Sequence, residues 1–138
     1  MLTYLTRTVK YGMLRVVRKS PRVGFMLVCQ GSHIMYARNV TLHLKANSAD
    51  EFSRTLETDV LPMLRKQNGF KDELAFVGSD GAAAVSISMW DRKESADAYG
   101  RDTYPTVLKS LSNVIEGTPT VETYEVSNST FHQIPARN

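Results

Sequence analysis

Hydrophobic and polar side chains alternate between Tyr36 and Lys45. The aliphatic positions share one side of this stretch and the polar positions share the other, namely Val40, Leu42 and Leu44 against Asn39, Thr41 and His43. A period of two residues is that of a strand with one buried face. The pattern therefore predicts a half-buried strand whose aliphatic side chains point toward the core.

A helical pattern follows this strand. Ser48 and Glu51 match a capping box, in which each side chain accepts a hydrogen bond from a backbone amide of the first turn. Pro62 lacks a backbone donor and is expected to bend the helix near Thr58, and Gly69 suits the position after the last turn. The apolar positions recur at helical spacing: Phe52, Leu56, Val60, Met63 and Leu64.

The next segment has the pattern of a β-hairpin. Residues 70–77 and 82–90 are rich in strand-forming residues, and Asp80-Gly81 between them is a strong turn signal. In the second of these strands we expect Val85, Ile87 and Met89 to face the core, which leaves the opposite face to Ser86, Ser88 and Trp90.

A second helical region follows Trp90. Asp91, with Glu94 three residues later, is the expected N-cap, and the proline of Tyr104-Pro105 suits a new first turn. Gly117 is expected to end the helix, and residues 120–126 form a fourth strand. The apolar positions of the second half are Val107, Leu111, Val114 and Ile115.

The predicted order is β-α-β-β-α-β, which indicates an α+β, ferredoxin-like fold. Right-handed crossovers then give a four-stranded antiparallel sheet with strands one and three at its centre and both helices on one face. The open face would carry Asn39, Thr41, His43, Ser86, Ser88 and Trp90, unless a single bulge inverts the parity. A second copy of the chain is expected to cover this face, which predicts a homodimer.

Composition agrees with one globular domain. The chain has 138 residues, of which 42% are hydrophobic and 22% charged, and a single cysteine, Cys29. No internal disulfide is therefore possible, a cytoplasmic location is expected, and no apolar run is long enough to span a membrane. We expect three parts: a basic leader without stable structure (1–34), a domain (35–127) and a C-terminal tail (128–138).

The net charge of +3 belongs to the leader. Residues 1–34 hold six of the 17 basic residues and none of the 14 acidic ones. The rest of the chain carries 11 cations against 14 carboxylates, so the expected domain lacks the basic surface typical of nucleic-acid binding.

Several short motifs resemble the antibiotic biosynthesis monooxygenase (ABM-like) family of dimeric α/β barrels. They are LPMLRKQNGF at 61–70, a strand that ends in Trp90, D-x-K-E-x-A-x-x-Y at 91–99, YP at 104–105 and TYEV at 123–126. The resemblance covers residues 35–127. It implies a homodimer with a small pocket in each subunit, between the sheet and the helices. The family includes cofactor-independent oxygenases of aromatic polyketides, haem-degrading enzymes and aldehyde-handling enzymes.

The haem-degrading branch of this family has an asparagine, a tryptophan and a histidine at three positions of its site. Alignment on the helix caps places Val40, Tyr99 and Lys109 there, so the imidazole that would bind iron is missing. These departures argue against haem cleavage. The three histidines, His33, His43 and His132, show no metal-ligand spacing, so neither a metal nor a cofactor is expected.

Five residues are candidates for an oxygenase site. His43 is the candidate base, Asn39 would hold an enolate or peroxide by hydrogen bonds, and Tyr99 would orient a phenolic substrate. Trp90 and Tyr104 would line the substrate pocket. Each also has a structural interpretation: Trp90 as a wedge between strand and helix, the tyrosines as buried rings, and the polar pair as interface residues.

Two functions remain open from the sequence. One is a cofactor-independent monooxygenase acting on a small aromatic or quinone-like substrate. The other is a non-catalytic dimeric barrel that binds a small apolar ligand or acts in a stress response. A cavity of a few hundred Å³ reached by His43, Tyr99 or Asn39 would favour the enzyme. A packed interior, with those side chains bonded to the backbone, would favour the second function.

Overall fold

The computed structural model describes residues 34–132 and 134, so nearly all of the predicted basic leader lies outside the described residues. The elements follow the predicted order. They are β1 (Tyr36–Leu44), α2 (Ala49–Thr55), η1 (Leu56–Val60), α3 (Leu61–Arg65), β2 (Phe70–Val77), β3 (Ala83–Trp90), α4 (Lys93–Asp102), α5 (Tyr104–Leu111) and β4 (Ile115–Glu125).

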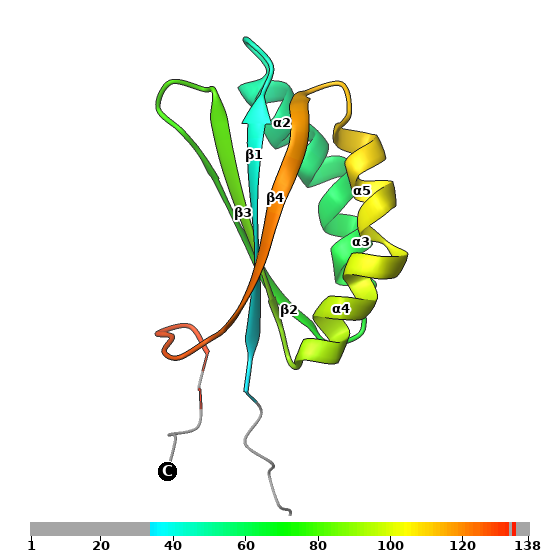
Figure 1. Cartoon of the computed structure of the whole chain (residues 1–138), viewed down its shortest axis with the longest axis vertical. Coiled ribbons are helices and arrows are strands. Elements are labelled where there is room, and N and C mark those ends of the chain that lie inside the picture. The colour runs from blue at the N-terminus through cyan, green and yellow to red at the C-terminus, as the bar shows by residue number, and fades with distance from the viewer. Residues whose placement is uncertain (1–33, 133, 135–138) are drawn as a thin grey trace, which may run out of the picture. The chain divides into compact units, whose positions relative to one another are not determined.

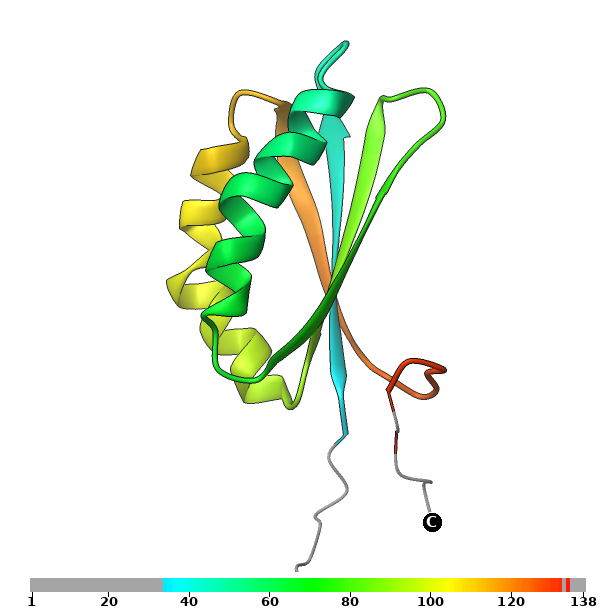
Figure 2. The same ribbon diagram turned by 180° about the vertical axis from the view of Figure 1, so that it is seen from behind.

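The four strands form one antiparallel sheet in the order β2-β3-β1-β4, with β1 and β3 at the centre. Figures 1 and 2 show all the helices on one side of this sheet, while the other side is left open. The α+β, ferredoxin-like fold predicted from the element order is thus confirmed.

The first helical region is one run of three segments. The distortion expected near Thr58 is present, because residues Leu56–Val60 form a π-helical turn just before Pro62. Gly69 has a φ of 79°, a conformation that suits the glycine predicted after the helix. The capping box was wrong: the Ser48 side chain makes no cap hydrogen bond, and only its carbonyl accepts one, from the amide of Phe52 at 2.8 Å.

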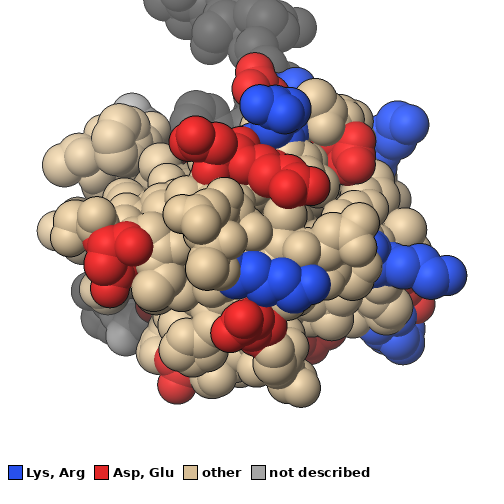
Figure 3. All heavy atoms as spheres, turned by 90° about the horizontal axis from the view of Figure 1, so that it is seen from above, with Lys and Arg blue, Asp and Glu red and all other residues tan. Residues whose placement is uncertain are grey.

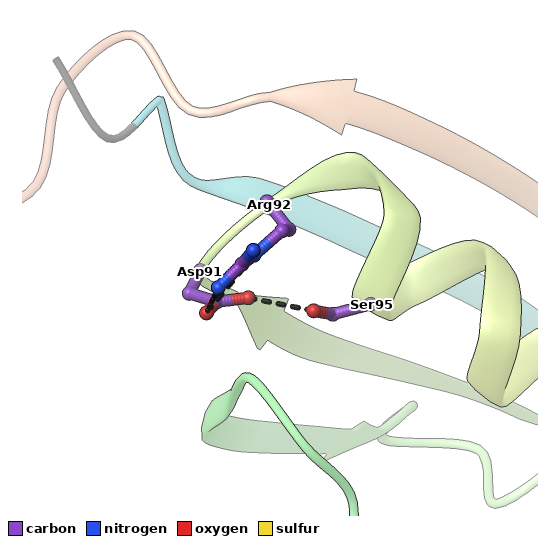
Figure 4. Close-up of polar contacts among 3 residues, drawn as sticks. All are labelled: Asp91, Arg92 and Ser95. Carbon is purple, nitrogen blue, oxygen red and sulfur yellow. Dashed lines mark hydrogen bonds and ion pairs between the residues drawn. The ribbon is translucent and has the colours of Figure 1, made fainter. Parts of the chain in front are cut away.

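Two further local predictions need correction. The N-cap of α4 is Arg92 and not Asp91, whose Oδ1 instead accepts a hydrogen bond from the Ser95 hydroxyl at 2.7 Å (Figure 4). Gly117 does not end a helix. It lies inside β4 with a φ of 66°, near the register shift opposite Thr41 and His43, so the strand begins at Ile115, earlier than expected.

The predicted parity of β3 was also wrong. Val40 pairs with Ser86 and Leu42 with Ala84, and paired residues share a face of the sheet. Val40 and Leu42 are buried under the helices, so Ser86, Ser88 and Trp90 face the helices as well, and Val85, Ile87 and Met89 lie on the open face. Hydrophobic residues occupy both faces of β3, so alternation alone could not identify the core side.

The core lies between the inner face of the sheet and the helices. Its largest fully buried side chains are Trp90, Phe52, Leu42, Leu64 and Val114. At the end of the molecule that carries the turns after β1 and between β2 and β3, basic and acidic side chains are interspersed among neutral ones (Figure 3). None of the helices within the described residues is long and apolar enough to cross a membrane.

Candidate functional site

A small cavity of about 20 Å³ lies between the inner face of the sheet and the helices. Most of its walls are aliphatic side chains from β1, η1, α3 and α5. The polar residues in its lining come from β2, β3, α4 and α5, and they are Glu73, Ser86, Ser88, Tyr99 and Tyr104. A space of this size holds about one water molecule, so the cavity is a polar-edged gap in an apolar core.

Glu73 is the ionisable group of the cavity. Its register opposite Ser88 turns the side chain inward from the edge strand β2. Oε1 accepts a hydrogen bond from the Ser86 hydroxyl, whereas Oε2 is buried without a partner among the described residues. Burial raises the pKa of Glu73 to about 7, against the opposing effect of the Ser86 hydrogen bond, and the nearby charge of Asp72 raises it further. This carboxyl group can therefore accept or donate a proton near neutral pH.

Two tyrosines, one from α4 and one from α5, belong to the cavity lining. Tyr99 is 5% exposed, and its ring centroid lies 6.1 Å from that of Tyr104. Burial raises the pKa of both hydroxyls, so both remain protonated near neutral pH and can donate hydrogen bonds. Within the part of the chain that the structure describes, the Tyr104 hydroxyl is buried without a partner. It is the second unsatisfied polar atom among the residues that line the cavity, after Glu73 Oε2.

Trp90 supports this site from outside the cavity. The indole is fully buried, stacks on Tyr99 with ring centroids 4.9 Å apart, and meets the edge of Phe70 at 5.7 Å. Its Nε1 donates a hydrogen bond to the Ser88 hydroxyl at 3.0 Å, so its polar atom is satisfied. Trp90 is not in the lining of the cavity. Trp90 therefore packs between the end of β3 and α4, and its role in substrate binding stays a prediction.

The structure separates the five predicted site residues. Tyr99, Tyr104 and Trp90 lie together on the inner side of the sheet. His43 and Asn39 lie on the open face, because each is one residue away in β1 from inward-facing Val40 or Leu42. The Asn39 Oδ1 atom is buried there without a partner, and His43 is exposed. Neither side chain can reach the cavity within this chain, so their catalytic roles stay predictions.

Sequence reasoning missed Glu73, Ser86 and Arg38. The Arg38 guanidinium carbon lies 4.5 Å from the ring centroid of Tyr104 and 5.7 Å from that of Tyr99. The error in the β3 parity hid Ser86, because it placed this residue on the open face. Arg38 shares a side of β1 with Val40 and Leu42, but a charged residue was not expected on the core side. The sequence around Glu73 contains no signal of its inward orientation. Leu74 and Phe76 are apolar and suggest the opposite orientation, whereas the register places both of them on the open face.

A surface cleft of about 700 Å³ adjoins the cavity through Tyr99, which lines both. The other walls of the cleft come from the turn at residues 67–69 and from the polar side of α4, including Arg92, Ser95 and Asp102. Tyr99 is therefore a residue that the cavity and the cleft have in common. No cluster of three potential metal-binding side chains is found within the described residues.

Comparison with protein-family models finds no match, and a search of curated proteins finds none either. Solved structures do match. A protein of unknown function from Nitrosomonas europaea is 16% identical, with a TM-score of 0.60 over 78% of this chain and all of its own. The monooxygenase ActVA-Orf6 of Streptomyces coelicolor, solved in complex with nanaomycin D, is 17% identical, with a TM-score of 0.60 over 75% of this chain and 95% of its own.

A provisionally assigned antibiotic biosynthesis monooxygenase from Bordetella bronchiseptica also matches. It is 9% identical, with a TM-score of 0.60 over 69% of this chain and 99% of its own. At these identities the matches establish a shared fold. The resemblance inferred from the sequence is confirmed at that level: the chain has the fold of the antibiotic biosynthesis monooxygenase-like proteins.

Proposed function

We propose that the chain is a monooxygenase that oxidises a small phenolic or quinol-type aromatic substrate and needs no resident cofactor. The observation that carries the proposal is the buried carboxyl group of Glu73, which lines the same cavity as Tyr104. Its Oε2 atom and the Tyr104 hydroxyl are buried without a hydrogen-bond partner among the described residues. Unsatisfied buried polar atoms are uncommon in folded proteins and favour a site that is completed by a ligand. The shared fold with ActVA-Orf6 adds support.

In the proposed reaction Glu73 takes a proton from an activated ring CH₂ of a substrate such as an anthrone. The resulting carbanion passes one electron to O₂, and the two radicals combine into a C–O–O bond. Loss of the second carbon-bound proton with cleavage of the O–O bond leaves a carbonyl and a hydroxide. The proton held by Glu73 converts this hydroxide to water. The substrate supplies all four electrons, so CH₂ and O₂ become C=O and H₂O without another reductant.

The proposal requires the substrate to enter a space larger than the cavity described here. At about 20 Å³ the cavity admits a water molecule but no aromatic ring. Tyr99 lines both this cavity and the adjoining cleft, so a change in its rotamer would join the two. Tyr99 would then act as the wall that opens for the substrate and closes over it, which excludes water from the carbanion.

Oxygen consumption tests the proposed function. The wild-type chain is assayed with a panel of anthrones and hydroquinones, beside Glu73→Gln and the matched control Glu57→Gln, which removes an exposed carboxylate on η1. We expect Glu73→Gln to lower kcat at least about 100-fold, as for loss of a general base, and Glu57→Gln to keep it. Tyr104→Phe should lower it less. Oxygen uptake by none of the substrates, or equal uptake by Glu73→Gln, would contradict the proposal.

The alternative function, a non-catalytic barrel that binds a small apolar ligand, has one observation in its favour. The cavity is small and mostly aliphatic, which falls short of the few hundred Å³ expected for an enzyme pocket. Two polar atoms of the lining residues, Glu73 Oε2 and the Tyr104 hydroxyl, are however buried without a hydrogen-bond partner among the described residues. Binding of an apolar ligand, such as naphthalene, without any oxygen uptake would favour this alternative.

We further propose that the chain forms a homodimer through the open face of the sheet. This face carries several hydrophobic side chains from β2, β3 and β4, of which Phe76 is 54% and Tyr124 51% exposed. Helices cover only one side of the sheet, so a twin chain is the natural cover for the other. Sedimentation at micromolar concentration tests this: Ile87→Lys should yield monomers from a wild-type dimer, and a monomeric wild type would contradict it. A cytoplasmic location stays a prediction.

A further inference from the structure

Arg38 has its side chain on the helix side of the sheet and contacts residues of the cavity lining, although it is not itself part of that lining. Its register pairs it with Ser88, a residue of the cavity lining, and with Thr123. The guanidinium lies over the Tyr104 ring at 4.5 Å and beside the Tyr99 ring at 5.7 Å. These are cation–π distances, so the two rings that flank the cavity also hold the cation in position.

The backbone of α4 lies close to this cation at Gly100. A Cβ atom on Gly100 would lie 2.8 Å from Arg38 Nη1 and 3.3 Å from Cζ, so any larger residue there would push against the guanidinium. Glycine within a helix costs about 1 kcal/mol relative to alanine. A larger residue at position 100 would therefore displace the Arg38 guanidinium from its present place.

The charge of Arg38 has no counter-ion within the described part of the chain. No carboxylate among those residues forms an ion pair with it, and its Nε atom is buried without a hydrogen-bond partner. A partly buried arginine is normally paired, because removing its charge from water is costly. The planar guanidinium matches the two oxygens of a carboxylate, which satisfies both the charge and the free donors.

We propose that Arg38 binds the carboxylate of an aromatic ligand whose ring lies against Tyr99 and Tyr104. The substrate class would then be hydroxyaromatic carboxylic acids, with the acidic group anchored at Arg38 and the ring directed toward the cavity. This inference deepens the proposed function, since it names the substrate class of the same site. Recognition by Arg38 concerns binding alone and does not depend on the oxidation.

A matched pair of ligands tests the role of Arg38. Calorimetric titrations at pH 7.5 compare 1-hydroxy-2-naphthoate with 1-hydroxy-2-naphthamide, which has the same shape but no charge. We expect the wild-type chain to bind the acid at least about tenfold more tightly than the amide, as for a charge-assisted hydrogen bond. Arg38→Gln should bring the affinity for the acid down to that for the amide and leave amide binding unchanged.

Two further variants complete the test. Arg54→Gln, which removes an exposed arginine on α2, should keep the tenfold preference for the acid. Arg38→Lys keeps the charge but loses the planar fork, so it should retain only part of the preference. This variant decides the matter if Arg38→Gln fails to fold. Equal affinities for acid and amide in the wild type, or a preference that Arg38→Lys leaves intact, would overturn the proposal.

The two proposals fail in different ways. If the acid binds through Arg38 but no panel substrate consumes oxygen, the carboxylate site stands and the monooxygenase proposal falls. If neutral hydroquinones and anthrones are oxidised equally by the wild type and Arg38→Gln, and acid and amide bind alike, the monooxygenase stands and the carboxylate site falls.

Discussion

The two faces of the sheet differ in the polarity of the side chains that the same strand contributes to them. On β3 the inner face carries Ser86, Ser88 and Trp90, whereas the open face carries Val85, Ile87 and Met89. The more polar of these two sets is the one turned to the core. This comparison shows that an inward serine need not weaken a core when a partner satisfies it. Ser88 accepts a hydrogen bond from Trp90 and Ser86 donates one to Glu73.

The largest expected difference in stability is between substitutions of Trp90 and Met89, which are neighbours on opposite faces of β3. Trp90→Ala removes a fully buried ring system that contacts Phe70 and Tyr99, so we expect a loss of about 3–5 kcal/mol in the free energy of unfolding. Met89→Ala, one residue earlier on the open face, should cost clearly less, because the Met89 side chain is only partly buried within its own chain. Urea unfolding measures both. Similar losses from the two variants would break the comparison between the faces.

The pH dependence of stability sharpens the comparison at Glu73. Its pKa rises from the ordinary 4.5 to about 7 in the folded chain, so the unfolded chain ionises first as the pH increases. The free energy of unfolding should therefore fall by about 2–3 kcal/mol between pH 4.5 and pH 7 and then level off. Below pH 4.5 both states are protonated, and this group contributes nothing.

Urea unfolding from pH 5 to 8.5 checks this sign. Glu73→Gln should remove the decline and make the chain more stable than wild type at pH 8, since no charge is then buried. Glu57→Gln, at an exposed position, should keep the wild-type decline. A wild-type stability that rises over this pH range would show that the Glu73 carboxyl group is not buried in the way described.

A smaller effect is expected at Ser88. Ser88→Ala leaves Trp90 Nε1 buried without its acceptor, so the free energy of unfolding should fall by about 1–2 kcal/mol. Thr41→Val, a similar loss of a hydroxyl on the open face, should change stability by less than about 0.5 kcal/mol. Thermal or urea unfolding compares the pair. An equal cost at both positions would mean that the Trp90 hydrogen bond contributes little.

The element order was predictable because local signals agree with one another. The alternation around Val40, the helical spacing from Phe52 to Leu64 and the Asp80-Gly81 turn each depend on residues close in sequence, and all are found as expected. The caps were less predictable. Ser48 and Asp91 both have side chains that suit an N-cap, yet neither caps its helix. Asp91 Oδ1 accepts a hydrogen bond from Ser95 and lies against Gly69, where a Cβ atom would be only 2.1 Å away.

The candidate site was only half predictable. Tyr99, Tyr104 and Trp90 were identified because aromatic residues at a strand end and on an amphipathic helix tend to meet in the core. Glu73 was not identified, because its apolar neighbours Leu74 and Phe76 suggest that the carboxylate points outward. Arg38 was not identified, because a charged residue was not expected on the core side of β1. His43 and Asn39 were grouped with the tyrosines, although the sheet separates them.

The sequence by itself determined the order of helices and strands, and with it the ferredoxin-like topology, since periodicity and turn signals are local properties of the chain. Only the tertiary structure decided which side of β3 faces the helices. That choice follows from strand register, where a shift of one residue exchanges the two faces, and from the burial of Trp90 against Tyr99 and Phe70. The inward placement of Glu73, Ser86 and Arg38 follows from the same register, because strand pairing is a contact between residues far apart in the chain.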